Sequence, residues 1–223
     1  VTGGAGFIGS AIVWKLNQLG KTNIIIVDEL GKDEKWKNLV GLKYEDFVNK
    51  LEFIEQVLDD VIPYSVDAII HMGANSSTTE KDADHLMDNN YHYTKELAKY
   101  CVEKNIRFIY ASSAATYGDG LLGFDDDESK LETLRPLNMY GYSKQLFDLW
   151  AKRNSILDRI VGIKYFNVYG PNEYHKADMR SVVHKAFEQV CDTGKVRLFK
   201  SLNPIYKDGE QMRDFVYIKD AVD

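Results

Sequence analysis

The glycines near the amino terminus constrain the fold of this chain more than any other feature. The run Val1-Thr2-Gly3-Gly4-Ala5-Gly6-Phe7-Ile8-Gly9 has glycines at both the G-x-G-x-x-G and the G-x-x-G-x-x-G spacing. Gly4 allows a sharp turn out of a strand, Gly6 lets the main chain approach a pyrophosphate, and Gly9 lets the following helix pack close to a sheet. Glycine triplets are common in ordinary turns. Placed between a strand and a helix, however, this run predicts a dinucleotide-binding turn whose helix amino end faces the phosphates.

A strand–helix–strand pattern surrounds the turn. After Gly9 an apolar stripe at helical spacing runs up to Gly20, and Ile24–Val27 is typical of a buried parallel strand. That strand is followed by Asp28, whose carboxylate is placed to accept hydrogen bonds from ribose hydroxyls. The alternative for Asp28 is a plain turn residue at the end of a strand.

Two lysines leave the choice of dinucleotide open. Lys35 and Lys50 follow the acidic residue, and either could reach an adenosine 2'-phosphate. Most lysines are solvated surface charges, however. Spacing alone therefore allows both NAD and NADP.

Composition excludes several other classes of protein. The 223 residues are 44% hydrophobic and 28% charged, which is ordinary for a globular protein, and the net charge of −6 argues against nonspecific nucleic-acid binding. Cys101 and Cys191 have no metal or redox spacing and suit a reducing compartment. No apolar stretch reaches the length of a membrane span and no signal peptide is visible. We therefore expect a cytoplasmic protein that binds no nucleic acid, membrane or metal.

Alternating strand and helix patterns predict the fold. Strands are expected at 66–71, 107–111 and 160–166, and helices at 91–103, about 140–152 and 181–191. The alternation predicts an α/β Rossmann fold with a doubly wound parallel sheet. Residues 1–165 are expected to form an NAD(P)-binding domain, and residues 166–223 the start of a smaller substrate-binding domain. Because the chain begins at Val1 without methionine and stops at Asp223, we expect a piece of a longer protein.

A tyrosine, a lysine and a serine carry the expected chemistry. Tyr140 and Lys144 lie one helical turn apart, so the ammonium is expected to favour the phenolate and lower the tyrosine pKa. Ser113, at the end of a neighbouring strand, would hydrogen-bond the same substrate oxygen. Tyrosine–lysine pairs at this spacing also occur at 91/95 and 100/104. We interpret both as helix-surface pairs, because they precede the serine strand.

These motifs resemble a known superfamily. Thr2–Gly9, Ala111–Gly118 and Tyr140–Lys144 are similar to the extended short-chain dehydrogenases/reductases. Within that superfamily, longer stretches resemble the ADP-L-glycero-D-manno-heptose 6-epimerases, namely Ser76–Glu80, Met87–Tyr91, Tyr110–Gly118 and Tyr165–Pro171 continuing to His175-Lys176.

The resemblance implies an isomerase with tightly bound NADP that inverts C6'' of an ADP-activated heptose for the lipopolysaccharide core. The substrate carbon would be oxidised transiently and reduced again from the opposite face. The family uses two bases, which correspond to Tyr140 and Lys176; Lys144 would contact the cofactor and Ser113 the substrate. On sequence alone Lys176 would be an ordinary loop lysine. Family members also form homo-oligomers.

The same resemblance implies further contacts. Cofactor contacts correspond to Gly3, Gly6, Phe7, Ile8, Gly9, Asp28, Glu29, Lys35, Lys50, Met72, Gly73, Ala74, Asn75, Ser76, Asn89, Lys144, Val168 and Lys176. Substrate contacts correspond to Ser113, Asn167, Asp178, Lys185, Phe199 and Arg213. Some of these positions depart from the family: Glu29 replaces a usual Asn, Asp178 a small hydroxyl residue and Lys185 a His. The extra carboxylate of Glu29 is unfavourable to a 2'-phosphate.

Two alternatives stay open. The first is another sugar-nucleotide enzyme, such as a UDP-hexose 4-epimerase or a 4,6-dehydratase. A dehydratase is expected to carry an Asp-Glu pair after the serine position, and Ser113–Thr116 has none. The second is a nucleotide-sensing module that kept the fold and lost the chemistry. The intact serine, tyrosine and lysines speak against it.

Overall fold

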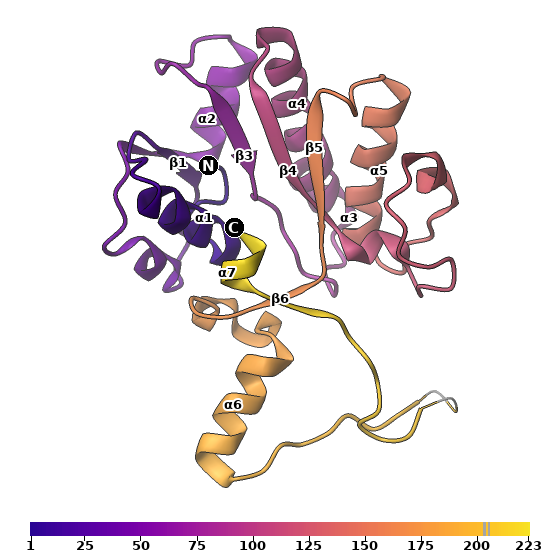
Figure 1. The fold of residues 1–223 in the computed structure, drawn as a ribbon. Coiled ribbons are helices and arrows are strands. Elements are labelled where there is room, and N and C mark those ends of the chain that lie inside the picture. The colour runs from indigo at the N-terminus through magenta and orange to yellow at the C-terminus, as the bar shows by residue number, and fades with distance from the viewer. Residues whose placement is uncertain (203, 205) are drawn as a thin grey trace. The chain divides into compact units, whose positions relative to one another are not determined.

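The chain divides into two compact units, Val1–Tyr165 and Phe166–Asp223 (Figure 1). The computed structural model describes residues 1–202, 204 and 206–223. The first unit contains the glycine turn and the predicted tyrosine and serine. That the second unit binds substrate stays a prediction.

The first unit is built on a parallel sheet. Its strands are β1 (Ile25–Asp28), β2 (Asp46–Asn49), β3 (Ala68–His71), β4 (Arg107–Ser113) and β5 (Ile160–Tyr165). β1 pairs with β2, and β3 and β5 flank β4, all in parallel register. Thr2 forms parallel bridges to both Val27 and His71 and so joins the two groups of strands. The predicted Rossmann fold is therefore confirmed, and the strand order reverses at Thr2, the place where open α/β sheets bind ligands.

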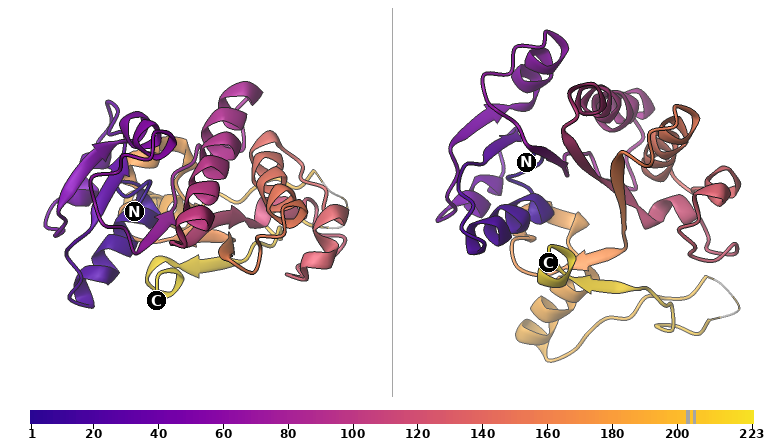
Figure 2. Two further views of the ribbon diagram at one scale, coloured as in Figure 1. Left: turned by 90° about the horizontal axis from the view of Figure 1, so that it is seen from above. Right: turned by 45° about the horizontal axis from the view of Figure 1, so that its top comes forward.

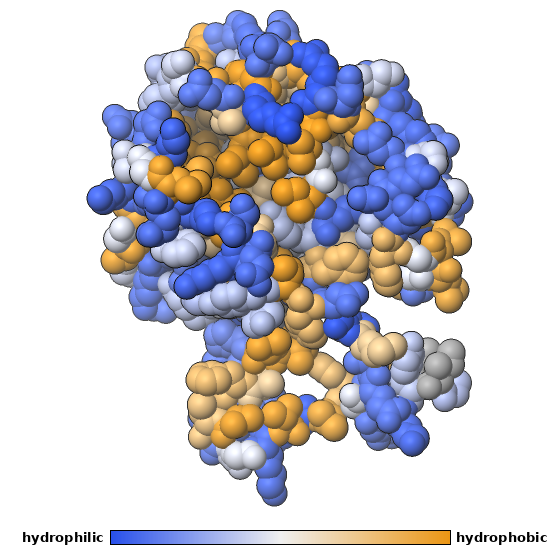
Figure 3. Space-filling view, viewed as in Figure 1, coloured by the Kyte–Doolittle hydropathy of each residue, from blue (hydrophilic) through white to orange (hydrophobic). Residues whose placement is uncertain are grey.

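Helices cover the sheet unequally. α1 (Phe7–Gln18) follows the glycine turn, while α2 (Lys50–Leu58), α4 (Tyr93–Lys104) and α5 (Met139–Arg153) lie side by side on the other face (Figure 2). On the face opposite α5, apolar side chains remain near the surface over the central strands (Figure 3), where Ile163 is 36% exposed and Ile70 and Ile109 are half-buried. The main core lies on the helical face.

Two clusters of buried side chains hold the first unit together. The larger one packs β3, β4 and β5 against α2, α4 and α5, with Phe108 and Phe147 at most 1% exposed. The smaller one packs α1 against β1, around Val13 and Ile26, which are fully buried. Side-chain caps fix where two helices begin: Asn49 accepts a hydrogen bond from the amide of Leu51, and Asn138 accepts one from the amide of Gly141.

Two parts of the first unit differ from the sequence expectation. β2 and α2 were not predicted. The helix expected at 91–103 is preceded by a short helix α3 (Ala83–Leu86) and a π-helical segment η2 (Met87–His92). Short 3₁₀ helices occur at η1 (Lys35–Leu39), η3 (Ala114–Tyr117) and η4 (Glu128–Thr133), the last within the segment 119–135.

The second unit contains a small parallel pair of strands and one long helix. β6 (Asn167–Tyr169) pairs with β7 (Phe215–Tyr217), which leads into α7 (Ile218–Ala221). Between them lie a 3₁₀ segment η5 (Tyr174–Met179) and α6 (Val182–Thr193). α6 begins one residue later and ends two residues later than predicted. No residue of α6 is buried, and Phe187 is 70% exposed.

Candidate active site

The glycine turn is as tight as its sequence predicts. A Cβ on Gly9 would lie 2.0 Å from the carbonyl oxygen of Gly3, and a Cβ on Gly3 would lie 2.6 Å from the amide nitrogen of Gly73. Gly3 also has φ +67°, a conformation that favours glycine. The turn therefore passes directly against the loop that follows β3, and only backbone fits between them.

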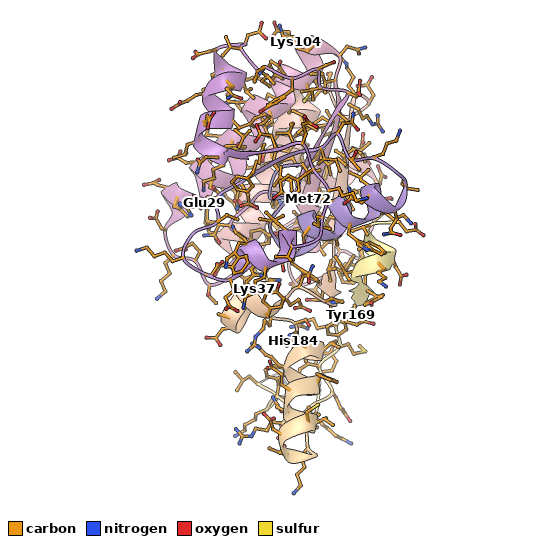
Figure 4. The ribbon with its side chains drawn as sticks, turned by 90° about the vertical axis from the view of Figure 1, so that its left-hand side faces the viewer. Glu29, Lys37, Met72, Lys104, Tyr169 and His184 are labelled. Carbon is orange, nitrogen blue, oxygen red and sulfur yellow. The ribbon has the colours of Figure 1, made fainter. Side chains whose placement is uncertain are left out.

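A pocket of about 410 Å³ opens beside this turn. It collects residues from the ends of β1 and β3 and from the first turns of α2 and η2. Predicted cofactor contacts in its lining are Gly3, Asp28, Glu29, Lys35, Lys50, Gly73, Ala74, Asn75 and Asn89. Met72, labelled with Glu29 in Figure 4, lies in the loop after β3 but does not line the pocket. Gly6 caps α1, whose first three residues are Phe7, Ile8 and Gly9, and Ser76 is exposed.

Acidic and basic side chains alternate at one end of the pocket. Asp28 accepts hydrogen bonds from the amides of Ala5 (2.9 Å) and Glu29 (2.8 Å) and forms an ion pair with Lys35 at 2.9 Å. Lys50 lies 2.9 Å from the Glu29 carboxylate and donates to Asn89 Oδ1 at 3.1 Å. Both lysines are thus held in the pocket by carboxylates. These features suit a dinucleotide. The tight glycine turn leaves room for its pyrophosphate, Asp28 at the end of β1 can bind a ribose, and the two lysines supply positive charge.

Asn90 joins the pocket to the helix that carries the tyrosine. Its side chain accepts from the amide of Asn75 (2.9 Å), donates to the Asn75 carbonyl (2.9 Å) and donates to Ser143 Oγ (3.1 Å). It is fully buried. Sequence reasoning did not single out this residue, although Met87–Tyr91 was one of the stretches that carried the family resemblance.

The predicted serine, tyrosine and lysine lie together in the first unit. Ser113 ends β4, and Tyr140 is the second residue of α5. Burial raises the pKa of Tyr140, and hydrogen bonding to the Ser113 side chain opposes that rise. Burial also lowers the pKa of Lys144 to about 8. The expectation that Lys144 lowers the tyrosine pKa is therefore not met in the protein alone, where burial is the main influence on the Tyr140 pKa.

The other tyrosine–lysine pairs are surface pairs, as expected. Lys95 lies 5.5 Å from the centre of the Tyr91 ring, and Lys104 lies 5.9 Å from the Tyr100 ring and forms an exposed ion pair with Asp60. Neither pair meets the end of β4. The choice of Tyr140 over these repeats stays a prediction.

Lys176 lies in η5, and a buried carboxylate organises the chain around it. Glu173 accepts hydrogen bonds from the amides of Gly170 (2.9 Å) and Ser181 (2.6 Å) and from Ser181 Oγ (2.9 Å). Burial lowers the pKa of Lys176, and Glu173 opposes that shift. The next residue, Ala177, has φ +46°, which is strained for a residue with a side chain.

The other predicted contacts of the second unit do not converge within it. Asn167 donates to the Asp214 carbonyl (2.8 Å), and Lys185 donates to the Asp178 carbonyl (2.6 Å). Phe199 is 65% exposed, and Arg213 donates to the carbonyl of its neighbour Met212. Val168 is buried in β6. Their roles stay predictions.

Comparison with known proteins now decides the family. Residues 1–223 match the sequence profile of the NAD dependent epimerase/dehydratase family. The chain belongs to that family. It is 60% identical, over its whole length and 69% of the relative, to a protein of Nitratidesulfovibrio vulgaris named ADP-L-glycero-D-manno-heptose-6-epimerase.

Solved structures of the family agree with the fold. A Helicobacter pylori ADP-L-glycero-D-manno-heptose-6-epimerase superposes with a TM-score of 0.82 at 30% identity, over all of this chain and 68% of that one. A UDP-glucuronic acid 4-epimerase from Bacillus cereus in complex with NAD superposes with a TM-score of 0.74 at 26% identity, over 99% of this chain and 70% of that one.

Two structural features are absent from the described residues. In residues 1–202, 204 and 206–223 no helix is long and apolar enough to cross a membrane. The same residues contain no group of three or more His, Cys, Asp or Glu side chains that could hold a metal ion.

Proposed function

We propose that this chain contains the cofactor site and acid–base residues of an ADP-L-glycero-D-manno-heptose 6-epimerase. The observation that carries the proposal is that Ser113 acts on Tyr140, one helical turn from Lys144, to lower the tyrosine pKa, in a chain 60% identical to a protein of that name. The reaction inverts C6'' of ADP-D-glycero-D-manno-heptose, in the cytoplasm, for the heptose of the lipopolysaccharide core.

Tyr140, Ser113 and Lys144 would act together on one face of the sugar. When bound, the nicotinamide supplies reversible oxidation of the substrate carbinol carbon. The Tyr140 phenolate takes the proton of the substrate hydroxyl and, as phenol, returns it to the carbonyl oxygen. Ser113 donates a hydrogen bond to the same oxygen. Lys144, when protonated, favours the phenolate by its charge and so offsets part of the burial that raises the Tyr140 pKa.

Inversion requires proton transfer on the opposite face as well, and we assign that task to Lys176. Its pKa is lowered by burial, which increases the fraction present as the neutral amine that accepts a proton. We assign substrate binding to Asn167, Asp178, Lys185, Phe199 and Arg213, with the Arg213 guanidinium on the ADP phosphates.

NADP is the proposed cofactor and NAD the alternative. Lys35 and Lys50 favour a 2'-phosphate, whereas their carboxylate partners Asp28 and Glu29 favour a ribose hydroxyl. Nucleotide released from the denatured, freshly purified protein and identified by mass spectrometry distinguishes the two. If Glu29 disfavours the phosphate, Glu29→Asn should raise the NADP:NAD affinity ratio.

The function is tested on the full-length protein, which we expect to be a homo-oligomer. ADP-D-glycero-D-manno-heptose is supplied without added reductant and the C6'' configuration is followed by NMR. Conversion to the L-glycero epimer at constant total heptose supports the proposal. Turnover of UDP-hexoses alone would instead support a UDP-hexose 4-epimerase, and nucleotide binding without any turnover would support a sensing module.

A further inference from the structure

A buried carboxylate behind the candidate active site has no assigned task. Asp148 lies on α5, one turn beyond Lys144, and is 2% exposed. One oxygen accepts a hydrogen bond from the Tyr110 hydroxyl at 2.9 Å. The other accepts from Ser112 Oγ at 2.8 Å and pairs with Lys164 at 2.6 Å. These bonds connect α5 to both β4 and β5.

Lys164, the cation of this network, has several partners, as Asp148 does. Lys164 Nζ also donates to Thr116 Oγ1 at 2.9 Å and lies 5.5 Å from the centre of the Tyr117 ring. Thr116 and Tyr117 belong to η3, which directly follows Ser113. The ion pair therefore holds the segment on both sides of the serine.

The network lies outside the dinucleotide pocket. Tyr110, Ser112, Asp148 and Lys164 line a different hollow of about 500 Å³ and none of them lines the pocket beside the glycine turn. Burying an ion pair is seldom a net gain in stability over an apolar pair of the same size. A fixed geometry for the neighbouring reactive groups is a benefit that an apolar pair would not provide.

We infer that Asp148 is a positioning residue for the reaction proposed above. By binding Ser112 and Tyr110 it holds α5 against the end of β4, so that Tyr140 meets Ser113. Its charge also favours the protonated form of Lys144. The inference rests on the proposed function of Tyr140, Ser113 and Lys144.

The charged groups around Lys144 and Asp148 determine how activity should depend on pH. Lys144 interacts with Asp148 on its own helix and with His71 on β3. Asp148 faces Tyr110 on β4, Tyr117 on η3 and Lys164 on β5. Burial lowers the pKa of Lys144 to about 8 and Asp148 opposes that shift, so removing the carboxylate should lower it further.

The test variant is Asp148→Asn in the full-length protein. It preserves shape, and its one carbonyl oxygen can still accept from Tyr110 while its amide group donates to Ser112 Oγ, but it loses the charge. We expect kcat to fall about tenfold with little change in KM, and the alkaline decline of kcat to begin about one pH unit lower. An NMR titration of ¹³C-labelled lysine, assigned with Lys144→Met, should show the same shift of the Lys144 pKa without any substrate. Asp60→Asn, which removes the partner of exposed Lys104, is the matched control. It should change neither kcat nor the Lys144 pKa.

A double variant separates positioning from stability. Asp148→Asn leaves the half-buried charge of Lys164 without its carboxylate partner, so it is expected to destabilise the fold. Asp148→Asn/Lys164→Met removes both charges and should recover thermal stability. Our inference predicts that kcat stays low and that the Lys144 titration stays shifted in this double variant. Recovery of both kcat and the wild-type Lys144 titration would mean that the ion pair serves stability alone. An unchanged Lys144 titration in either variant would overturn the inference.

If the wild-type protein does not convert ADP-heptose, the proposed function fails, and the titration still decides whether Asp148 acts on Lys144.

Discussion

Desolvation sets the charge state of the reactive residues. It raises the pKa of Tyr140 and lowers that of Lys144 to about 8, so both are pushed towards their neutral forms. His71, which is 1% exposed, follows the same rule: burial and then Lys144 lower its pKa well below the usual value. Its ring nitrogens contact Thr2 Oγ1 at 2.5 Å and Thr94 Oγ1 at 2.8 Å, which satisfies a neutral imidazole. His71 therefore serves as a structural link between the glycine turn and α4.

The first prediction concerns the tyrosine hydroxyl. Tyr140→Phe removes the proton carrier but leaves the dinucleotide pocket intact, so epimerisation should fall by at least about 10²-fold while bound nucleotide is retained. Product formation by NMR and nucleotide content of the purified variant are the measurements. Tyr100→Phe, from a pair with the same spacing, should be as active as the wild type. Equal losses in both variants would contradict the assignment of Tyr140.

The second prediction concerns Lys144 and stability. A lysine whose pKa is lowered by folding destabilises the protein at pH values below about 8, where both states are protonated. Between about 8 and 10 the unfolded chain binds the extra proton, so stability from this group rises with pH. Lys144→Met removes that dependence. The difference in free energy of unfolding between wild type and variant should therefore move in favour of the wild type by about 2 kcal/mol from pH 7 to pH 10. Urea unfolding at several pH values measures it; a constant difference would show that the Lys144 pKa is normal.

At the scale of elements, the sequence allowed prediction where the local signal was strong. The glycine turn, the end of β1 and the start of α5 have turn, apolar and capping residues that act locally, and each lies close to its predicted place. β2 and α2 escaped prediction because β2 spans only Asp46–Asn49 and three of its four residues are exposed or half-buried, so it lacks an apolar run. The π-helical η2 also could not be predicted, because it depends on contacts that Asn90 makes with a distant loop and with α5.

The third prediction tests the tight turn. Gly9→Ala would place a methyl group 2.0 Å from a backbone oxygen, which cannot move without displacing α1. We expect a loss of about 3 kcal/mol in unfolding free energy together with loss of nucleotide binding. Gly20→Ala is the control: Gly20 has φ +76° but open space around it, so only the left-handed backbone is strained, at about 1 kcal/mol. Nucleotide affinity should be unchanged in the control. Normal affinity in Gly9→Ala would refute the role of the turn.

The fourth prediction tests the link through Asn90. Asn90→Ala leaves the amide and carbonyl of Asn75 and the Ser143 hydroxyl without this partner, and each unsatisfied buried group costs about 1–3 kcal/mol. Denaturant unfolding should show a loss of about 3 kcal/mol, and calorimetry should show weaker nucleotide binding because the Asn75 loop is released. Asn154→Ala, at the exposed end of α5, removes a single bond to the Trp150 carbonyl and should leave affinity unchanged. Unaltered affinity in Asn90→Ala would mean that the loop is held by other contacts.

At the scale of the whole molecule, the two units differ in how they bury their side chains. Both hydrophobic clusters are made of residues from the first unit, and so are the glycine turn, the dinucleotide pocket and the Ser113–Tyr140 pair. In the second unit no residue of α6 is buried, and Leu198 and Phe199 are at least 65% exposed. A unit with its own core is expected to fold independently, whereas one with exposed apolar side chains is not.

The last prediction follows from that difference. Residues 1–165 expressed alone should unfold cooperatively and bind the dinucleotide, because every pocket-lining residue lies within them. They should not epimerise ADP-heptose, because the proposed second base Lys176 lies in the other unit. Thermal unfolding, calorimetric titration with NADP and NAD, and the NMR assay of product are the measurements. If residues 1–165 fold and bind nucleotide yet still invert the substrate, Lys176 is not required and both proton transfers belong to the first unit. If they fail to fold although the full-length protein is stable, the second unit contributes to the core, and the division at Tyr165 is not a boundary of stability.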